Sequence, residues 1–104
     1  MGQDLKSIFT HEKPIIGMVH LRPLPGSPMY DKKNMCMQQI IDTAVREAQL
    51  LEEGGVDGLQ IENIWDYPYV KGQDIGDETV AAMTAAAVNV KQNVKIPIGV
   101  NCHL

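Results

Sequence analysis

The stretch "NMCMQQIIDTAVREAQLLEEGGVDGLQIEN" (residues 34–63) decides the fold of this chain. In its first part, apolar side chains recur every three or four residues, which is the period of a helix with one buried face. Gly54 and Gly55 then supply a stop signal, and residues 56–63 form a short apolar run that predicts a buried strand. The predicted helical stripe consists of Met37, Ile40, Ile41, Ala44, Ala48 and Leu51.

The same alternation extends to both sides of this stretch. "KPIIGMVHL" (residues 13–21) predicts an earlier strand, and "KIPIGVN" (residues 95–101) predicts a later one. Between the strand at residues 56–63 and the strand at residues 95–101, we expect a second helix with Asp77 as its N-cap. Alternating strands and helices are typical of a parallel sheet with right-handed crossovers. The predicted fold is therefore α/β, with the elements in the order βαβαβ along the chain. The expected apolar stripe of the second helix consists of Val80, Met83, Ala87, Val90 and Val94.

Bulk properties exclude several classes of protein. The chain has 104 residues, which suffices for one domain, and its formal net charge of −4 argues against binding to nucleic acid. It contains neither the run of about 20 apolar residues that a membrane span requires nor a signal peptide at its start, so we expect a cytoplasmic protein. Cys36 and Cys102 lack metal-binding spacing and are expected to be reduced thiols.

Three polar side chains are expected at the carboxyl ends of the strands. Because side chains alternate along a strand, His20, Glu62 and Asn101 should share the side opposite the helices. A histidine, a carboxylate and an amide at that edge could supply general acid/base chemistry and an orienting hydrogen bond. Taken singly, each of these residues is more often a polar group satisfied by hydrogen bonds, or a loop anchor, than a catalyst. His20 and Glu62 would give a metal ion two ligands, so no metal site is predicted.

The loops after the first two strands carry further candidates. Arg22 could bind a phosphate or carboxylate, or could be a solvated rim residue. Trp65 and Tyr67 belong to an aromatic cluster that could form a wall for a ring-shaped ligand, or could pack the loop onto its own scaffold. Both alternatives stay open from the sequence.

Four blocks of sequence resemble the BtpA family, which includes the SgcQ-like proteins. They are "KPIIGMVHLRPLPGSP", "EGGVDGLQIENIWDYPY", "IGDETVAAMT" and "PIGVN", in that order. The resemblance implies a TIM barrel. It also implies a link either to photosystem I biogenesis, as for a cyanobacterial member, or to sugar-metabolism or nucleosidase-type enzymes, as for SgcQ-like members. The family pattern includes His20, Glu62, Asn63, Trp65, Asp66 and Asn101 of this sequence.

A barrel of this kind needs eight strand and helix units in about 250 residues. We therefore expect residues 1–104 to be a single partial domain, the amino-terminal part of such a barrel. Three functions follow as hypotheses. In the first, the full-length protein acts on a small sugar- or nucleoside-like ligand. In the second, it is an assembly or stability factor that associates peripherally with a membrane complex. In the third, the chain has no independent activity and self-associates through its open sheet edge. The sequence identifies no cofactor. Expected catalytic residues are His20, Glu62 and Asn101, and expected ligand contacts are Arg22, Asn63, Trp65, Asp66 and Tyr67.

Overall fold

The computed structural model describes residues 13–25, 30, 31, 33, 35–63 and 77–101. Within them the chain forms three strands and two helices in the predicted order. The elements are β1 (Ile16–His20), α2 (Met37–Glu53), β2 (Gly58–Glu62), α3 (Asp77–Asn93) and β3 (Ile98–Asn101). The βαβαβ prediction is confirmed.

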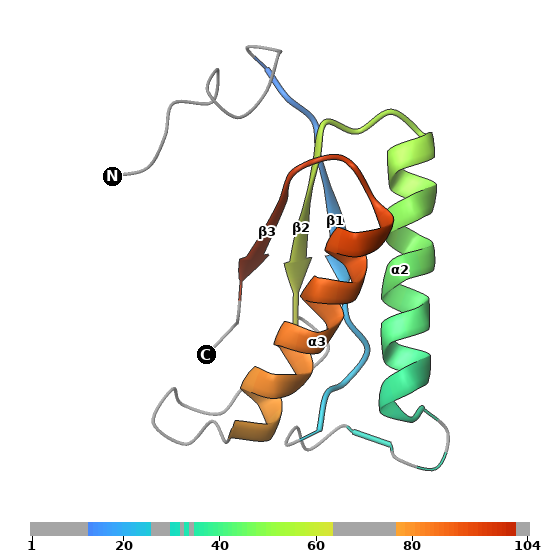
Figure 1. Ribbon diagram of the computed structural model, residues 1–104, viewed down its shortest axis with the longest axis vertical. Coiled ribbons are helices and arrows are strands. Elements are labelled where there is room, and N and C mark those ends of the chain that lie inside the picture. The colour runs from blue at the N-terminus through green and yellow to red at the C-terminus, as the bar shows by residue number, and fades with distance from the viewer. Residues whose placement is uncertain (1–12, 26–29, 32, 34, 64–76, 102–104) are drawn as a thin grey trace.

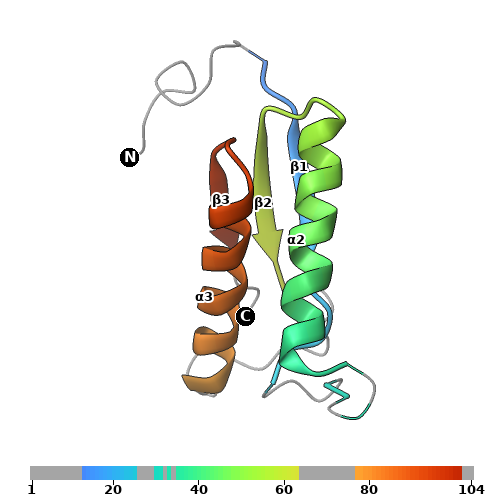
Figure 2. The ribbon, with the colours of Figure 1, turned by 45° about the vertical axis from the view of Figure 1, so that its right-hand side comes forward.

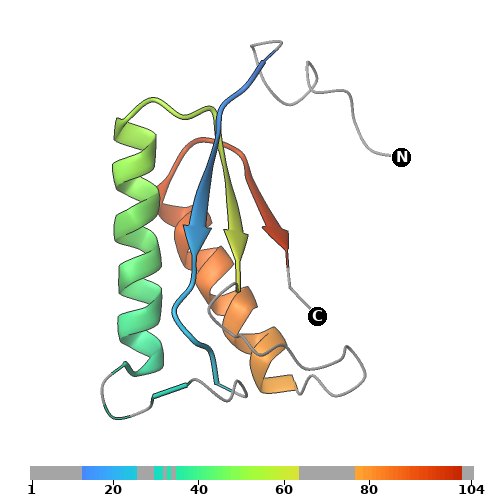
Figure 3. The same cartoon turned by 180° about the vertical axis from the view of Figure 1, so that it is seen from behind.

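The strands form one parallel sheet in the order β1-β2-β3, so consecutive strands are neighbours. Both helices lie on the same face of the sheet (Figure 1), and the view from behind shows β1 and β2 in front of α3 (Figure 3). Figure 2 shows α2 and α3 side by side along the sheet. Val19, Leu59 and Ile61 point into the helix layer and are at most 3% exposed. The core therefore lies between the sheet and the two helices.

Local sequence features account for both ends of helix α2. The backbone N–H of Cys36 donates a hydrogen bond of 2.8 Å to Oε1 of Gln39, which satisfies a donor ahead of the first turn. Gly55 has a φ of 95°, a conformation that glycine adopts without steric cost, so the helix ends there as predicted. The buried positions are Ile40, Ala44 and Ala48.

Helix α3 differs from its prediction in two respects. It begins at Asp77 itself, so this residue is the first helical position and not the cap. Val80 is 58% exposed although it was expected in the buried stripe. The sequence "ETVAAMTAAAV" is apolar on more than one side, and small alanines allow the closest approach to neighbouring elements. The buried face of α3 accordingly consists of Thr79, Ala82, Met83, Ala86 and Val90.

Two carboxylates hold the amino-terminal edge of the sheet. Oδ2 of Asp57 accepts a hydrogen bond of 2.8 Å from the backbone N–H of Ile15, just before β1. Oε2 of Glu52 accepts two bonds from the backbone, of 2.7 Å from Lys95 and 3.2 Å from Ile96, just before β3. Bonds to a charged acceptor are stronger than neutral ones. This edge therefore has a structural role, which leaves the opposite edge to be considered for function.

Candidate functional site

Three predicted site residues occupy adjacent register positions at the carboxyl edge of the sheet. His20 of β1 is the register partner of Glu62 of β2, and Glu62 is in turn the partner of Asn101 of β3. Neighbouring parallel strands lie about 4.8 Å apart, so the three backbone positions form a short row. Their neighbours Val19, Ile61 and Val100 form the adjacent row, and alternation directs these toward the helices. The row of His20, Glu62 and Asn101 thus belongs to the face without helices.

Glu62 is the central and most enclosed member of this row. It is 8% exposed, whereas His20 is half-buried and Asn101 is exposed. The amide Nε2 of Gln60 donates a hydrogen bond of 3.1 Å to Oε1 of Glu62. A buried carboxylate requires such partners because desolvation disfavours its charged form.

Gln60 is a site residue that sequence reasoning missed. It stands two residues before Glu62 on the same strand, and that spacing places both side chains on one face. Its register partner on β3 is Gly99, where an added Cβ would lie 3.6 Å from Oε1 of Gln60. This distance is an ordinary van der Waals contact, so the side chain of Gln60 lies beside the backbone of β3. The spacing of Gln60 and Glu62 was the available signal.

The same face of the sheet carries apolar side chains further from the edge. Ile16 is 40% exposed and Met18 is 41% exposed. Both precede His20 at alternate positions of β1, so they share its face. A ligand at the row would thus meet polar groups at the strand ends and an apolar surface beside them, which is the usual composition of a small-molecule site.

Arg22 lies against α2. Its Nη2 is 3.2 Å from Oε1 of Glu47, and its Nη1 donates a longer bond of 3.5 Å to the carbonyl oxygen of His20. The two charged side chains are 38% and 34% exposed. An anionic ligand at Arg22 would have to compete with Glu47. This pair could not be predicted from the sequence, because 25 residues separate the partners.

The start of the first loop is anchored in the core. Leu21 is 1% exposed and Leu24 is buried completely. The backbone N–H of Leu21 donates a 2.9 Å bond to the carbonyl oxygen of Glu62, and Oγ1 of Thr79 donates a 3.0 Å bond to the carbonyl oxygen of Pro25. These contacts join the loop after β1 to the end of β2 and to the first turn of α3.

The second loop is described only at its start. Asn63 directly follows β2 and is 2% exposed. Trp65, Asp66 and Tyr67 lie outside the described residues, so their predicted contacts stay predictions. Among the residues that the structure describes, no group of three or more His, Cys, Asp or Glu side chains could hold a metal ion. In the same described residues, no helix has the length and apolar character needed to cross a membrane.

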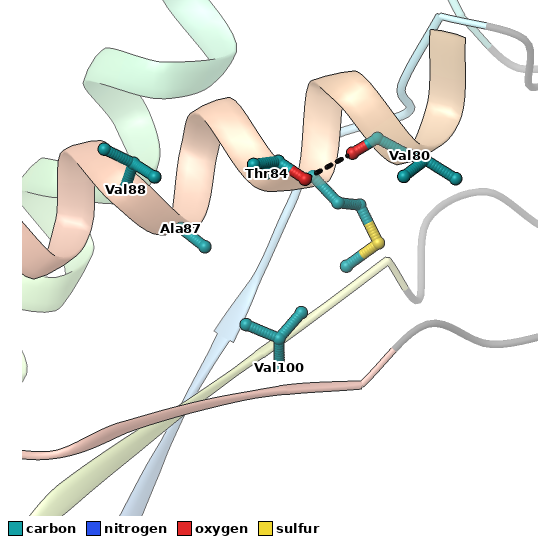
Figure 4. A pocket seen from close by; sticks show the side chains of 6 residues that line it. Val80, Thr84, Ala87, Val88 and Val100 are labelled. Carbon is teal, nitrogen blue, oxygen red and sulfur yellow. Dashed lines mark hydrogen bonds between the residues drawn. The ribbon is translucent and has the colours of Figure 1, made fainter. Parts of the chain in front are cut away.

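A separate hollow lies on the helix side of the sheet. It has a volume of about 410 Å³ and opens between α3 and β3 (Figure 4). Because Val100 points toward the helix layer, this hollow and the row of polar residues are on opposite faces of the sheet. The lining residues are Val80, Met83, Thr84, Ala87, Val88 and Val100.

A parallel sheet whose strands alternate with helices defines an α/β protein, and in proteins of this class ligands generally bind at the carboxyl ends of the strands. Comparison with known proteins then gives the family. The model of the BtpA family matches residues 11–103, and the chain belongs to this family.

The chain spans about a third of the length of the relatives that it matches. It is 49% identical over 90 residues to an uncharacterized protein of Archaeoglobus fulgidus, covering 86% of this chain and 34% of the relative. It is 37% identical over 97 residues to the putative sgc region protein SgcQ of Escherichia coli, covering 93% and 35%. It is 38% identical over 98 residues to the photosystem I biogenesis protein BtpA of a Synechocystis strain, covering 94% and 33%. No solved structure gives a significant match.

Proposed function

We propose that this chain is the amino-terminal part of a TIM barrel. The full-length barrel protein acts on a small sugar- or nucleoside-like ligand at the carboxyl edge of the sheet. The register of His20, Glu62 and Asn101 carries the proposal. In barrels of this class, active sites lie at the carboxyl ends of the strands. The relatives are about three times as long as this chain, which agrees with a barrel of about 250 residues.

The residues have complementary roles in this proposal. The imidazole of His20 transfers a proton to or from the ligand, and the carboxylate of Glu62 serves as the second acid/base group. The amide of Asn101 donates and accepts hydrogen bonds that orient hydroxyl groups. Arg22, Asn63, Trp65, Asp66 and Tyr67 contact the ligand around this row. A hydroxyl-rich ligand suits such a set because each hydroxyl both donates and accepts.

Calorimetric titration of a full-length protein that contains this segment tests the proposal. Ribose, ribose 5-phosphate, adenosine and uridine serve as probes. At least one should bind, and Glu62→Gln should weaken that binding at least tenfold. Glu53→Gln is the matched control, because it removes the same charge from an exposed position of α2. Equal affinities of the wild type and Glu62→Gln for the ligand would show that Glu62 does not take part in ligand binding.

A second candidate function rests on one relative. The similarity to a protein named for photosystem I biogenesis favours an assembly or stability factor for a membrane complex. This function predicts peripheral association with membranes through protein contacts, whereas the ligand-binding function predicts a cytoplasmic protein. Fractionation of cells separates them: recovery in the membrane fraction, reversed by high salt, supports the assembly factor, and recovery in the cytosol alone counts against it.

The isolated chain has a third candidate behaviour. In the described sheet, β1 and β3 each pair with one strand, so each has a backbone edge open to a further strand. We infer that 104 residues alone self-associate through these edges and lack independent activity. Sedimentation of the purified chain tests this, since a compact monomer at micromolar concentration contradicts edge pairing.

A further inference from the structure

The hollow between α3 and β3 has a surface suited to another helix. Val80, Thr84 and Val88 stand four residues apart and so form one continuous ridge along α3. Ridges at this spacing pack into the grooves of a neighbouring helix. Val80 is 58% exposed, Val88 48% and Val100 52%, so this apolar surface is open in the described structure.

The chemistry of the hollow excludes a polar ligand. The one hydroxyl among its lining side chains is that of Thr84, and its Oγ1 donates a 2.8 Å bond to the carbonyl oxygen of Val80 on the same helix (Figure 4). The other lining side chains are hydrocarbon or thioether, so nothing in the lining would orient a sugar. A sugar- or nucleoside-like molecule requires such polar groups. The apolar side chains of a protein segment can pack against this lining without such polar groups.

The position of the hollow indicates which segment fits. Helix α2 lies between β1 and β2 in the chain, and α3 lies between β2 and β3, side by side with α2 on one face of the sheet (Figures 1 and 2). The hollow lies beyond α3 in the same layer and over β3. A third helix of the same repeat, connected to β3, would occupy this place. The relatives are about three times as long as this chain, so proteins of this family have the length for further units.

We propose that the hollow formed by α3 and β3 is the seat of an amphipathic helix from the next strand and helix unit of a full-length family member. This inference rests on the proposed barrel. The apolar face of that helix covers Val80, Val88 and Val100, and Thr84 contributes its methyl group to the contact.

Coexpression tests this inference. The chain is produced together with the carboxyl-terminal remainder of the Archaeoglobus fulgidus relative, beyond the segment that this chain matches, and their complex is measured by copurification and calorimetry. The two polypeptides should associate, and Val80→Lys with Val88→Lys should weaken the association at least tenfold. Since both valines are about half exposed, the free chain should tolerate the substitutions. Gln49→Lys, at an exposed position of α2, is the control and should change the affinity less than twofold.

The other outcomes each overturn the inference. The polypeptides could fail to associate, or could associate equally well with the double lysine variant. Alternatively, the lysines could abolish only a homodimer of this chain, which would identify a second copy as the occupant. Glu62→Gln separates this inference from the proposed function: it should reduce ligand binding and leave the association unchanged. Loss of the predicted association with ligand binding intact would refute the helix seat alone.

Discussion

His20 and Glu62 lie opposite each other across β1 and β2, and the backbone N–H of the next residue, Leu21, donates a 2.9 Å hydrogen bond to the carbonyl oxygen of Glu62. The ladder between these strands therefore extends one residue beyond His20. Both candidate acid/base residues stand on backbone that is hydrogen-bonded across the sheet. Sites on strands are held more precisely than sites on free loops.

The bond from Gln60 to Glu62 should stabilise the fold as well as orient the carboxylate. We expect Gln60→Leu to lower the free energy of unfolding by about 1–3 kcal/mol, because it removes a donor from a buried acceptor. Urea denaturation measures this, and a double-mutant cycle with Glu62→Leu should show coupling. Gln38→Leu is the control. It breaks a similar 2.9 Å bond to Asp42 at an exposed site and should cost less. Equal losses in the two variants would contradict a special role for Gln60.

Glu52 should contribute more to stability than its neighbour Glu53. Glu52→Ala leaves two backbone donors before β3 without their carboxylate, and we expect a loss of about 1–3 kcal/mol. Glu53→Ala removes the same charge from an exposed position and should change stability by about 0.5 kcal/mol or less. Chemical denaturation of both variants provides the comparison. Indistinguishable midpoints would show that the two bonds contribute nothing.

The backbone of Gly17 in β1 packs closely against the side chain of Leu51 in α2. An added Cβ would lie 3.2 Å from Cδ1 of Leu51 and 3.3 Å from Cγ2 of Val56. We expect Gly17→Val to destabilise the fold by about 1–3 kcal/mol through overpacking. Adding Leu51→Ala should recover part of this loss. At Gly99 the nearest atom is 3.6 Å away, an ordinary contact, so Gly99→Val should be tolerated. Thermal unfolding that ranks Gly99→Val below Gly17→Val would contradict this packing.

The pairing of Arg22 with Glu47 should affect ligand affinity more than stability. The pair is more than a third exposed on the arginine side, so Glu47→Gln should cost at most about 1 kcal/mol and less in high salt. If Arg22 contacts an anionic ligand, the variant frees its guanidinium, and ribose 5-phosphate should bind more tightly to the full-length protein. Ribose, which lacks the phosphate, is the control. Unchanged affinity for both ribose 5-phosphate and ribose would indicate that Arg22 has a structural role and does not bind the ligand.

The sequence predicted the backbone better than the contacts. Period-two alternation sufficed to place His20, Glu62 and Asn101 on one face, because strand geometry leaves a side chain two choices. The buried face of α3 was not predictable in this way, since a helix rich in alanine and valine has several apolar faces and only its neighbours decide among them. The partners of Arg22 and Glu52 were also missed, because these bonds join segments far apart in the chain and depend on the packed structure.

A crystal structure of a full-length protein containing this segment, with a bound sugar or nucleoside, tests the central claim most directly. The account predicts ligand hydroxyls within about 3.2 Å of the Glu62 carboxylate and the Asn101 amide, with the imidazole of His20 facing the reacting bond. A ligand bound away from all three residues would contradict it.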